Sequence, residues 1–187
     1  MPAPHAPIHT ARLTLRPFES GDLDDLFAYI SRPDVVRYLY GNVKDRAEAQ
    51  ELLARWMAGS SMTQAGERLV LAVTPRDGRP VMGEVMLMWR SQEHQQAELG
   101  YVFHPDYHGQ GFAREAAQAM LNLGFQEFSF HRIFARCDAR NTASYTLMQR
   151  LGMRREAHFI HNELFKGEWS DELHYAILQT EWADKAR

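Results

Sequence analysis

The pattern of apolar and polar residues predicts seven strands along the chain. Leu13 and Leu15 alternate with polar neighbours in the segment Arg12–Phe18, and a period of two places apolar side chains on one face of a strand. The dipeptide Asp77-Gly78 lies between two further apolar runs and is typical of a hairpin turn. The other predicted strands are Arg68–Thr74, Pro80–Trp89, Glu93–Phe103, His131–Asp138, Met153–Phe165 and Glu172–Thr180.

The clearest helix is predicted over Gly111–Phe128. Its apolar residues recur at steps of three and four, as on one buried helical face, and its alanines allow that face to lie close to a sheet. Ser20-Gly21-Asp22 supplies capping side chains for an earlier helix. Further helices are predicted over Pro33–Leu39, Asp45–Ala58 and Thr142–Leu151. The order β-α-α-α-β-β-β-α-β-α-β-β predicts a mixed α/β sandwich instead of regular βαβ repeats.

The composition is that of one globular domain, with 187 residues of which 45% are hydrophobic and 24% charged. We expect residues 1–9, which include three prolines, to form a flexible tail, and residues 10–187 to form a single domain. The apolar runs are far shorter than the ~20 residues of a membrane span. A net charge of −3 gives no reason to expect nucleic-acid binding. The single cysteine, Cys137, excludes an internal disulfide and fits a cytoplasmic location.

A glycine-rich loop leads from the strand ending at Phe103 into the clearest helix. Gly109 and Gly111 permit backbone angles closed to other residues and present no side chain to an approaching group. The first N–H groups of a helix lack internal partners, so together with the helix dipole they form a site for a diphosphate. Arg114 adds positive charge. Taken alone, this loop is more simply a tight turn without a ligand, and it lacks the third glycine of a dinucleotide fingerprint and the lysine of a Walker loop.

A second strand-loop-helix unit follows at Asp138–Gly152. Asn141 turns the chain after the strand, and Ser144 lies in the first turn of the helix that begins there. Taken alone, Asn141 is a helix cap. Two such units close together in one sequence favour a ligand site over two unrelated turns.

The two units together resemble the GCN5-related N-acetyltransferase (GNAT) superfamily. The family's pyrophosphate loop, Arg/Gln-x-x-Gly-x-Gly/Ala, is matched by His108–Ala113, and its second element is matched by Asn141, Ser144 and Leu151-Gly152-Met153. The chain is most similar to the RimJ and RimL branch of ribosomal-protein acetyltransferases, which modify protein N-termini. Signatures shared with that branch are Tyr107–Ala113, Arg12–Arg16, Lys166–Asp171 and Tyr175–Leu178. The likeness spans about Thr10 to Glu181.

The resemblance implies an α/β fold with a mixed, mostly antiparallel sheet of about seven strands, flanked by helices and splayed between the fourth and fifth strands. It implies acetyl-CoA as cosubstrate, wedged between the strands Glu98–Phe103 and His131–Asp138. A backbone N–H near Val102 would polarise the thioester carbonyl. The expected cofactor-binding residues are Tyr101, Val102, Phe103, His108, Gly109, Gln110, Gly111, Phe112, Ala113, Arg114 and Asn141. A homodimer is also an expectation from the family.

Two residues depart from the family pattern. His108 replaces the arginine or glutamine that usually opens the loop, but backbone donation at that position should preserve binding. Met148 stands where many members have a tyrosine that protonates the departing thiolate, and methionine cannot donate a proton. We expect Ser144 to take this role, with Tyr145 and a water behind it.

Amide formation needs a neutral amine and therefore a base. At pH 7 roughly a tenth of a peptide α-amine is neutral, against about 0.04% of a lysine amine. An α-amine therefore demands little of its base, and a carboxylate suffices. The candidates, in order of preference, are Glu163, where the branch places an acidic residue facing the acceptor, then Glu98 and Glu84. For each of them, an exposed glutamate without function is the alternative.

The resulting hypothesis is an acetyl-CoA-dependent N-acetyltransferase that acts on a protein or peptide N-terminal α-amine. There are two alternatives. The protein acetylates a polyamine, amino acid or antibiotic, or it is a non-catalytic module that binds acetyl-CoA. In this family the region of Tyr38, Tyr40 and Trp56 shapes the acceptor pocket, with core packing the simpler interpretation for Trp56. No metal is expected, because His158 and His161 would point to opposite faces of a strand.

Overall fold

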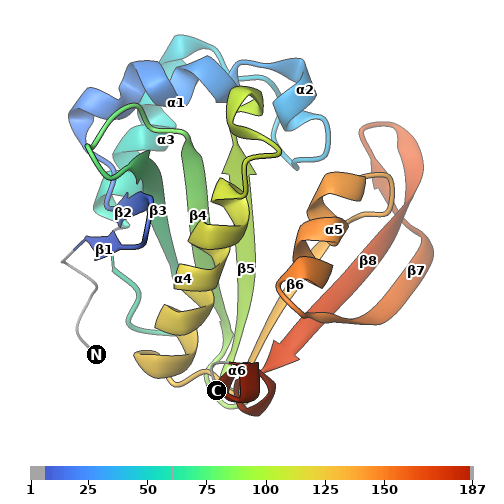
Figure 1. The fold of residues 1–187 in the computed structure, drawn as a ribbon. Coiled ribbons are helices and arrows are strands. Elements are labelled where there is room, and N and C mark those ends of the chain that lie inside the picture. The colour runs from blue at the N-terminus through green and yellow to red at the C-terminus, as the bar shows by residue number, and fades with distance from the viewer. Residues whose placement is uncertain (1–6, 60, 186–187) are drawn as a thin grey trace.

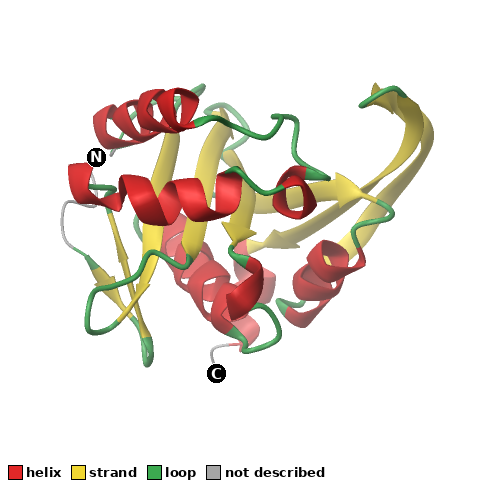
Figure 2. Cartoon of the chain, turned by 90° about the horizontal axis from the view of Figure 1, so that it is seen from above, coloured by secondary structure: helices red, strands yellow, loops and turns green. Residues whose placement is uncertain are grey.

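The computed structural model describes residues 7–59 and 61–185, and in them one eight-stranded sheet carries helices on both faces (Figures 1 and 2). The strands are β1 (Ile8–His9), β2 (Leu13–Arg16), β3 (Arg68–Pro75), β4 (Gly83–Ser91), β5 (Gln96–Phe103), β6 (Arg132–Asp138), β7 (Arg154–Phe165) and β8 (Glu168–Leu178). The helices are α1 (Leu23–Ile30), α2 (Pro33–Val36), α3 (Arg46–Ala58), α4 (Phe112–Gln126), α5 (Thr142–Arg150) and α6 (Gln179–Lys185). None of the helices in the described ranges is both long and apolar enough to cross a bilayer.

The sheet is antiparallel except at one parallel pair in its middle. Its strand order is β1-β2-β3-β4-β5-β6-β8-β7, and β5 and β6 are the parallel neighbours. They pair only at Gln96–Arg132, Ala97–Ile133 and Glu98–Phe134. Beyond these pairs the two strands diverge, as Figure 1 shows. This confirms the predicted splay, because β5 and β6 are the fourth and fifth of the seven strands that the sequence predicts.

Two hydrophobic clusters hold the helices against opposite faces of the sheet. The larger cluster lies between the sheet and α4, and the smaller one lies under α1 and α3. Ala116 and Ala117 are fully buried, and a Cβ on Gly124 would lie 2.6 Å from Ile133. The small residues thus bring α4 close to the strands, as its sequence predicts. Trp56 is buried against Phe18 with ring centroids 4.8 Å apart, which confirms its packing role.

Some boundaries differ from those that the sequence predicts. Ile8 and His9, at the end of the predicted tail, pair with β2 and form the eighth strand; residues 1–6 lie outside the described ranges. β4 begins at Gly83, after the predicted start at Pro80, because Val81 gives its N–H to the Asp25 carboxylate. β8 begins directly after the Lys166-Gly167 turn, well before Glu172. The last predicted strand ends at Leu178, where α6 follows.

Candidate active site

The loop between β5 and α4 is tied to the end of β5 by His108. A 3-10 turn at Pro105–Tyr107 follows the strand, and Nε2 of His108 lies 3.0 Å from the carbonyl oxygen of Phe103. The histidine that departs from the family pattern therefore has a structural use. Its ring hydrogen-bonds to the strand backbone, so the loop begins from a fixed point.

The backbone of this loop fits a diphosphate group. Gly109 and Gly111 have φ of +74° and +82°, a region that other residues rarely adopt. The first hydrogen bond of α4 runs from the N–H of Glu115 to the carbonyl oxygen of Gly111, at 3.1 Å. Among the described residues, the N–H groups of residues 109–114 meet no acceptor, and a Cβ on Gly109 would meet nothing within 4 Å. Such a row of free donors at a helix N-terminus suits a diphosphate.

The diverging part of β5 directs backbone donors toward its open edge. The N–H of His104 donates to the carbonyl oxygen of Met82, at 2.9 Å. Because N–H directions alternate along a strand, the N–H of Val102 also points toward β4. The N–H groups of Tyr101 and Phe103 therefore point toward the side where β6 has diverged. These two amides, next to Val102, are the candidates to meet a thioester carbonyl or a pantetheine amide.

A tyrosine and a serine bridge the splay on the face that carries α4 and α5. The Tyr101 hydroxyl lies 3.0 Å from Ser144 Oγ and donates to the Ser144 carbonyl oxygen, also at 3.0 Å. Burial raises the pKa of Tyr101 above its ordinary value and raises the pKa of Cys137, which also contacts Ser144, to about 11. Asn141 Oδ1 accepts the Ser144 N–H at 3.2 Å, so its capping role is confirmed. The Tyr101 hydroxyl and the Cys137 thiol therefore stay protonated at neutral pH.

An ion-pair network around two buried carboxylates bridges the splay on the opposite face. Arg136 on β6 donates to Glu98 on β5 at 3.0 Å and to Glu172 on β8 at 3.1 Å. Arg90 also donates to Glu98, at 2.7 Å. The side chains of Glu98 and Glu172 are only 8% and 7% exposed. Glu98 is thus held by two guanidinium groups at the point where the strands part.

Glu163, the preferred candidate base, lies at the edge of this network. The Tyr40 hydroxyl donates to both of its carboxylate oxygens, at 3.0 and 3.1 Å. The Tyr40 ring centroid is 5.6 Å from Cζ of Arg136, which places Glu163 near the splay. Lys166 donates to the carbonyl oxygen of Gly41, at 3.0 Å, and joins the tip of the β7–β8 hairpin to the α2–α3 loop. Partial desolvation of the hydroxyl and its hydrogen bond to Glu163 raise the pKa of Tyr40 to about 12, so Tyr40 remains a donor.

Glu84, the third candidate, is enclosed beneath α1. It lies opposite Val102 in the sheet and accepts a hydrogen bond from the buried hydroxyl of Tyr29. Burial raises the pKa of Glu84 to about 8, although the hydrogen bond from Tyr29 opposes this shift. At neutral pH the group therefore holds its proton. An uncharged carboxyl of this kind is a poor base for an acceptor amine.

We expect Glu84→Gln to stabilise the protein at pH 8 but not at pH 4. Below about pH 4.5 the carboxyl is protonated both folded and unfolded. Between pH 4.5 and 8 the unfolded chain releases this proton and the folded chain retains it, so the free energy of unfolding falls, by at most about 1.4 kcal/mol per pH unit. Glutamine cannot ionise and removes this loss. Urea unfolding at pH 4, 6 and 8 measures the difference; parallel pH profiles for the two proteins would contradict the buried acid.

Two residues of this region have no predicted role in the sequence. Glu172 completes the Arg136 network, and Tyr29 partners Glu84. Neither carries a local signal, because each acts through a partner on a distant strand or helix. Within the described ranges no three His, Cys, Asp or Glu side chains are grouped so as to hold a metal ion.

Comparison with known proteins assigns the family. The family described as "Acetyltransferase (GNAT) domain" matches residues 12–154. The chain is 36% identical over 176 residues to the uncharacterized N-acetyltransferase YnaD of Bacillus subtilis, covering 94% of this chain and 98% of that protein. The crystal structure of a GNAT-family acetyltransferase from Bacillus anthracis superimposes with a TM-score of 0.84 at 35% identity, covering 94% of this chain and all of that one.

A more distant solved structure shares the fold. Spermidine N-acetyltransferase from Vibrio cholerae, in complex with CoA and spermine, has a TM-score of 0.78 at 22% identity, covering 93% of this chain and 99% of that one. The matched family region contains the splay, the glycine-rich loop and Asn141. The protein therefore belongs to the GNAT acetyltransferase family, whose members transfer the acetyl group of acetyl-CoA to an amine.

Proposed function

We propose that the protein acetylates the N-terminal α-amine of a peptide or protein, by direct attack on the thioester in a ternary complex. The observation that carries this choice is Glu163, a partly exposed carboxylate held by Tyr40 beside the splay. A carboxylate in contact with water is a weak base. Such a base can deprotonate an α-amine, whose pKa is 7.7–8.0. It is far less suited to a lysine-like amine, whose pKa is near 10.4. The resemblance to the RimJ and RimL branch supports the same acceptor.

The chain's own residues divide the work between binding and proton transfer. When bound, acetyl-CoA supplies the thioester whose acyl carbon accepts the amine. The N–H groups of Gly109–Arg114 bind the diphosphate, and the Tyr101 and Phe103 amides, at the open edge of β5, polarise the carbonyl oxygen. Glu163 takes the proton from the amine, directly or through a water.

Protonation of the leaving thiolate falls to Ser144. Its hydroxyl gives its proton to the thiolate and regains one from water, while the Tyr101 hydroxyl, 3.0 Å away, keeps its own hydrogen on the Ser144 carbonyl oxygen and holds Ser144 in place. Asn141 positions Ser144 by capping the first turn of α5. Because a thiolate is a good leaving group, this assistance contributes less to the rate than the base does.

A small cationic amine is the second candidate acceptor. The fold is shared with a spermidine N-acetyltransferase, and three carboxylates, Glu98, Glu163 and Glu172, lie near the splay, where Arg136 and Arg90 are the guanidinium partners of Glu98 and Glu172. Negative charge at this position would attract a polyamine as readily as a peptide N-terminus.

Incubation with acetyl-CoA and a mixed pool of acceptors tests the proposal. The pool contains peptides that differ in their first residue, free amino acids, polyamines and aminoglycosides, and mass spectrometry identifies the products. We expect one acetyl group on peptide α-amines, with a preferred first residue. Acetylation confined to polyamines or other small amines would overturn the peptide assignment and establish the second candidate.

A further inference from the structure

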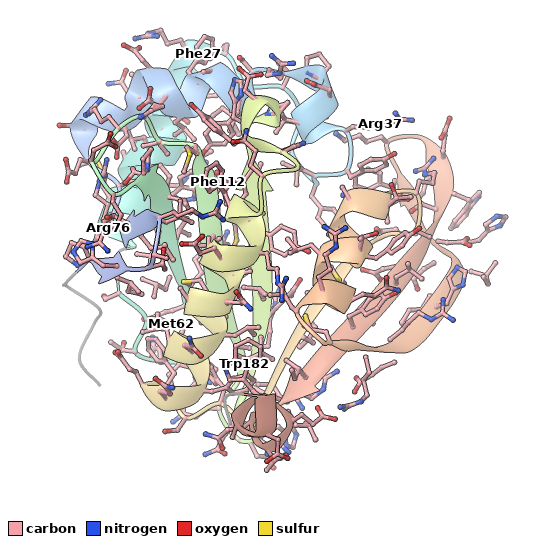
Figure 3. All side chains as sticks on the ribbon, viewed as in Figure 1. Phe27, Arg37, Met62, Arg76, Phe112 and Trp182 are labelled. Atoms are coloured by element: carbon pink, nitrogen blue, oxygen red, sulfur yellow. The ribbon has the colours of Figure 1, made fainter. Side chains whose placement is uncertain are left out.

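Arg12, in the turn between β1 and β2, contacts the glycine-rich loop from a distant part of the sequence. Its Nε lies 2.7 Å from the Glu115 carboxylate, and its Nη1 donates to the carbonyl oxygen of Gln110, at 3.0 Å. Its Cζ is also 4.6 Å from the ring centroid of Phe112, which begins α4 (Figure 3). One guanidinium thus holds residues on both sides of Gly111.

Glu115 completes this contact from the first turn of α4. Its carboxylate accepts the Thr10 hydroxyl at 2.6 Å and the Arg12 backbone N–H at 2.8 Å, in addition to Arg12 Nε. Partial burial acts to raise the pKa of Glu115, but these hydrogen bonds outweigh it and lower that pKa. The carboxylate is therefore ionised at neutral pH and remains a partner of Arg12.

The bond from Arg12 to Gln110 sets the direction of a backbone donor. In a trans peptide unit the C=O of one residue and the N–H of the next point in opposite directions. Because the Gln110 carbonyl points at Arg12, the Gly111 N–H points away from it. Space beside Gly111 is limited, since a Cβ there would lie 3.3 Å from Arg12 Nη2.

We propose that Arg12 is a positioning residue for the diphosphate-binding loop, and that it orients the Gly111 N–H for acetyl-CoA by holding Gln110 and Glu115 together. This inference rests on the proposed function, because it assumes that the loop binds the diphosphate. Arg12 and Arg16 are the two arginines of the Arg12–Arg16 signature. The proposed role of Arg12 differs from that of Arg16, which pairs with the fully buried Asp22. Lysine lacks the planar fork that reaches two acceptors at once.

Three variants separate this role from general effects of charge and folding. Arg12→Gln removes the contacts, and Arg12→Lys keeps the charge without the fork. Arg76→Gln is the matched control: Arg76 donates to the Thr10 carbonyl oxygen of the same turn, at 3.1 Å, and within the described residues none of its hydrogen bonds reaches the loop. Calorimetry gives the Kd for CoA, and hydrogen exchange of the ligand-free proteins gives the protection of the Glu115 N–H, whose bond to the Gly111 carbonyl oxygen is the first of α4. Activity is compared with acetyl-CoA and with S-acetylpantetheine, which lacks the diphosphate.

For both Arg12 variants we expect the Kd for CoA to rise roughly tenfold and exchange of the Glu115 amide to quicken, because its bond to the Gly111 carbonyl oxygen loses the support of Arg12. Activity with S-acetylpantetheine should stay at the wild-type level, and Arg76→Gln should bind CoA normally. Wild-type affinity in both Arg12 variants, or equal weakening in Arg76→Gln, would overturn the positioning role. If Arg12→Lys alone binds CoA normally, the contribution of Arg12 is its positive charge and not its planar fork, which would overturn the positioning role. Failure of the wild-type protein to bind CoA would instead refute the proposed function, while exchange of the Glu115 amide still shows whether Arg12 orders the start of α4.

Discussion

Replacing Gly111 with valine is expected to weaken CoA binding by about 100-fold or more. Gly111 has φ of +82°, where a β-branched residue is strongly disfavoured. Its Cβ would also press on Arg12, 3.3 Å away. The chain can relieve this strain only by rotating the peptide units around Gly111, which turns the loop N–H groups away from the diphosphate. Isothermal titration with CoA measures the loss.

Gly66→Val is the matched control for this prediction. Gly66 has a similar φ of +95°, and a Cβ there would meet nothing within 4 Å. The variant therefore carries comparable backbone strain in an open turn outside the glycine-rich loop. We expect a lower thermal midpoint but normal CoA affinity. Should both variants bind CoA as the wild type does, the loop would not be the diphosphate site.

Replacing Glu163 with glutamine is expected to lower kcat at pH 7 by about 100-fold, without changing the Kd for CoA. Glutamine keeps the size of the side chain and an oxygen that accepts the Tyr40 hydroxyl, but it cannot take the amine's proton. The defect should shrink as the pH rises to 9, because the α-amine then loses its proton to water without help. Steady-state rates on the preferred peptide from pH 6.5 to 9 measure this convergence.

Two further variants define what the Glu163 result means. Glu168→Gln removes a carboxylate from an exposed position on β8, where the side chain is 74% accessible, and should leave kcat unchanged. Tyr40→Phe keeps Glu163 but removes its hydrogen bond and should lower kcat only a few-fold. A Glu163→Gln defect of the same size at every pH would show that the carboxylate positions the acceptor and is not the base. An unaltered kcat would assign the proton transfer to another group.

Much of the candidate site was predictable because its signals are local. Glycines at positive φ, a helix that begins immediately after them, and a capping Asn141 are all short-range features of the sequence. The splay followed from the family resemblance and was confirmed by the three-residue pairing of β5 and β6. The strand Ile8–His9 escaped prediction because two residues carry no periodicity, and only their partners on β2 make them a strand.

The sheet order, in contrast, decided which distant side chains meet. Because β8 lies between β6 and β7, it brings Glu172 to Arg136, while the β7–β8 hairpin carries Glu163 to Tyr40, 123 residues away in the chain. Likewise, Arg12 reaches Glu115 across 103 residues. Hydrophobic periodicity and turn residues depend on neighbours along the chain. They therefore predict the helices, the strands and the glycine-rich loop. Tertiary packing selects the order of the strands, and that order brought Arg136 to Glu98 and left Glu163 partly accessible.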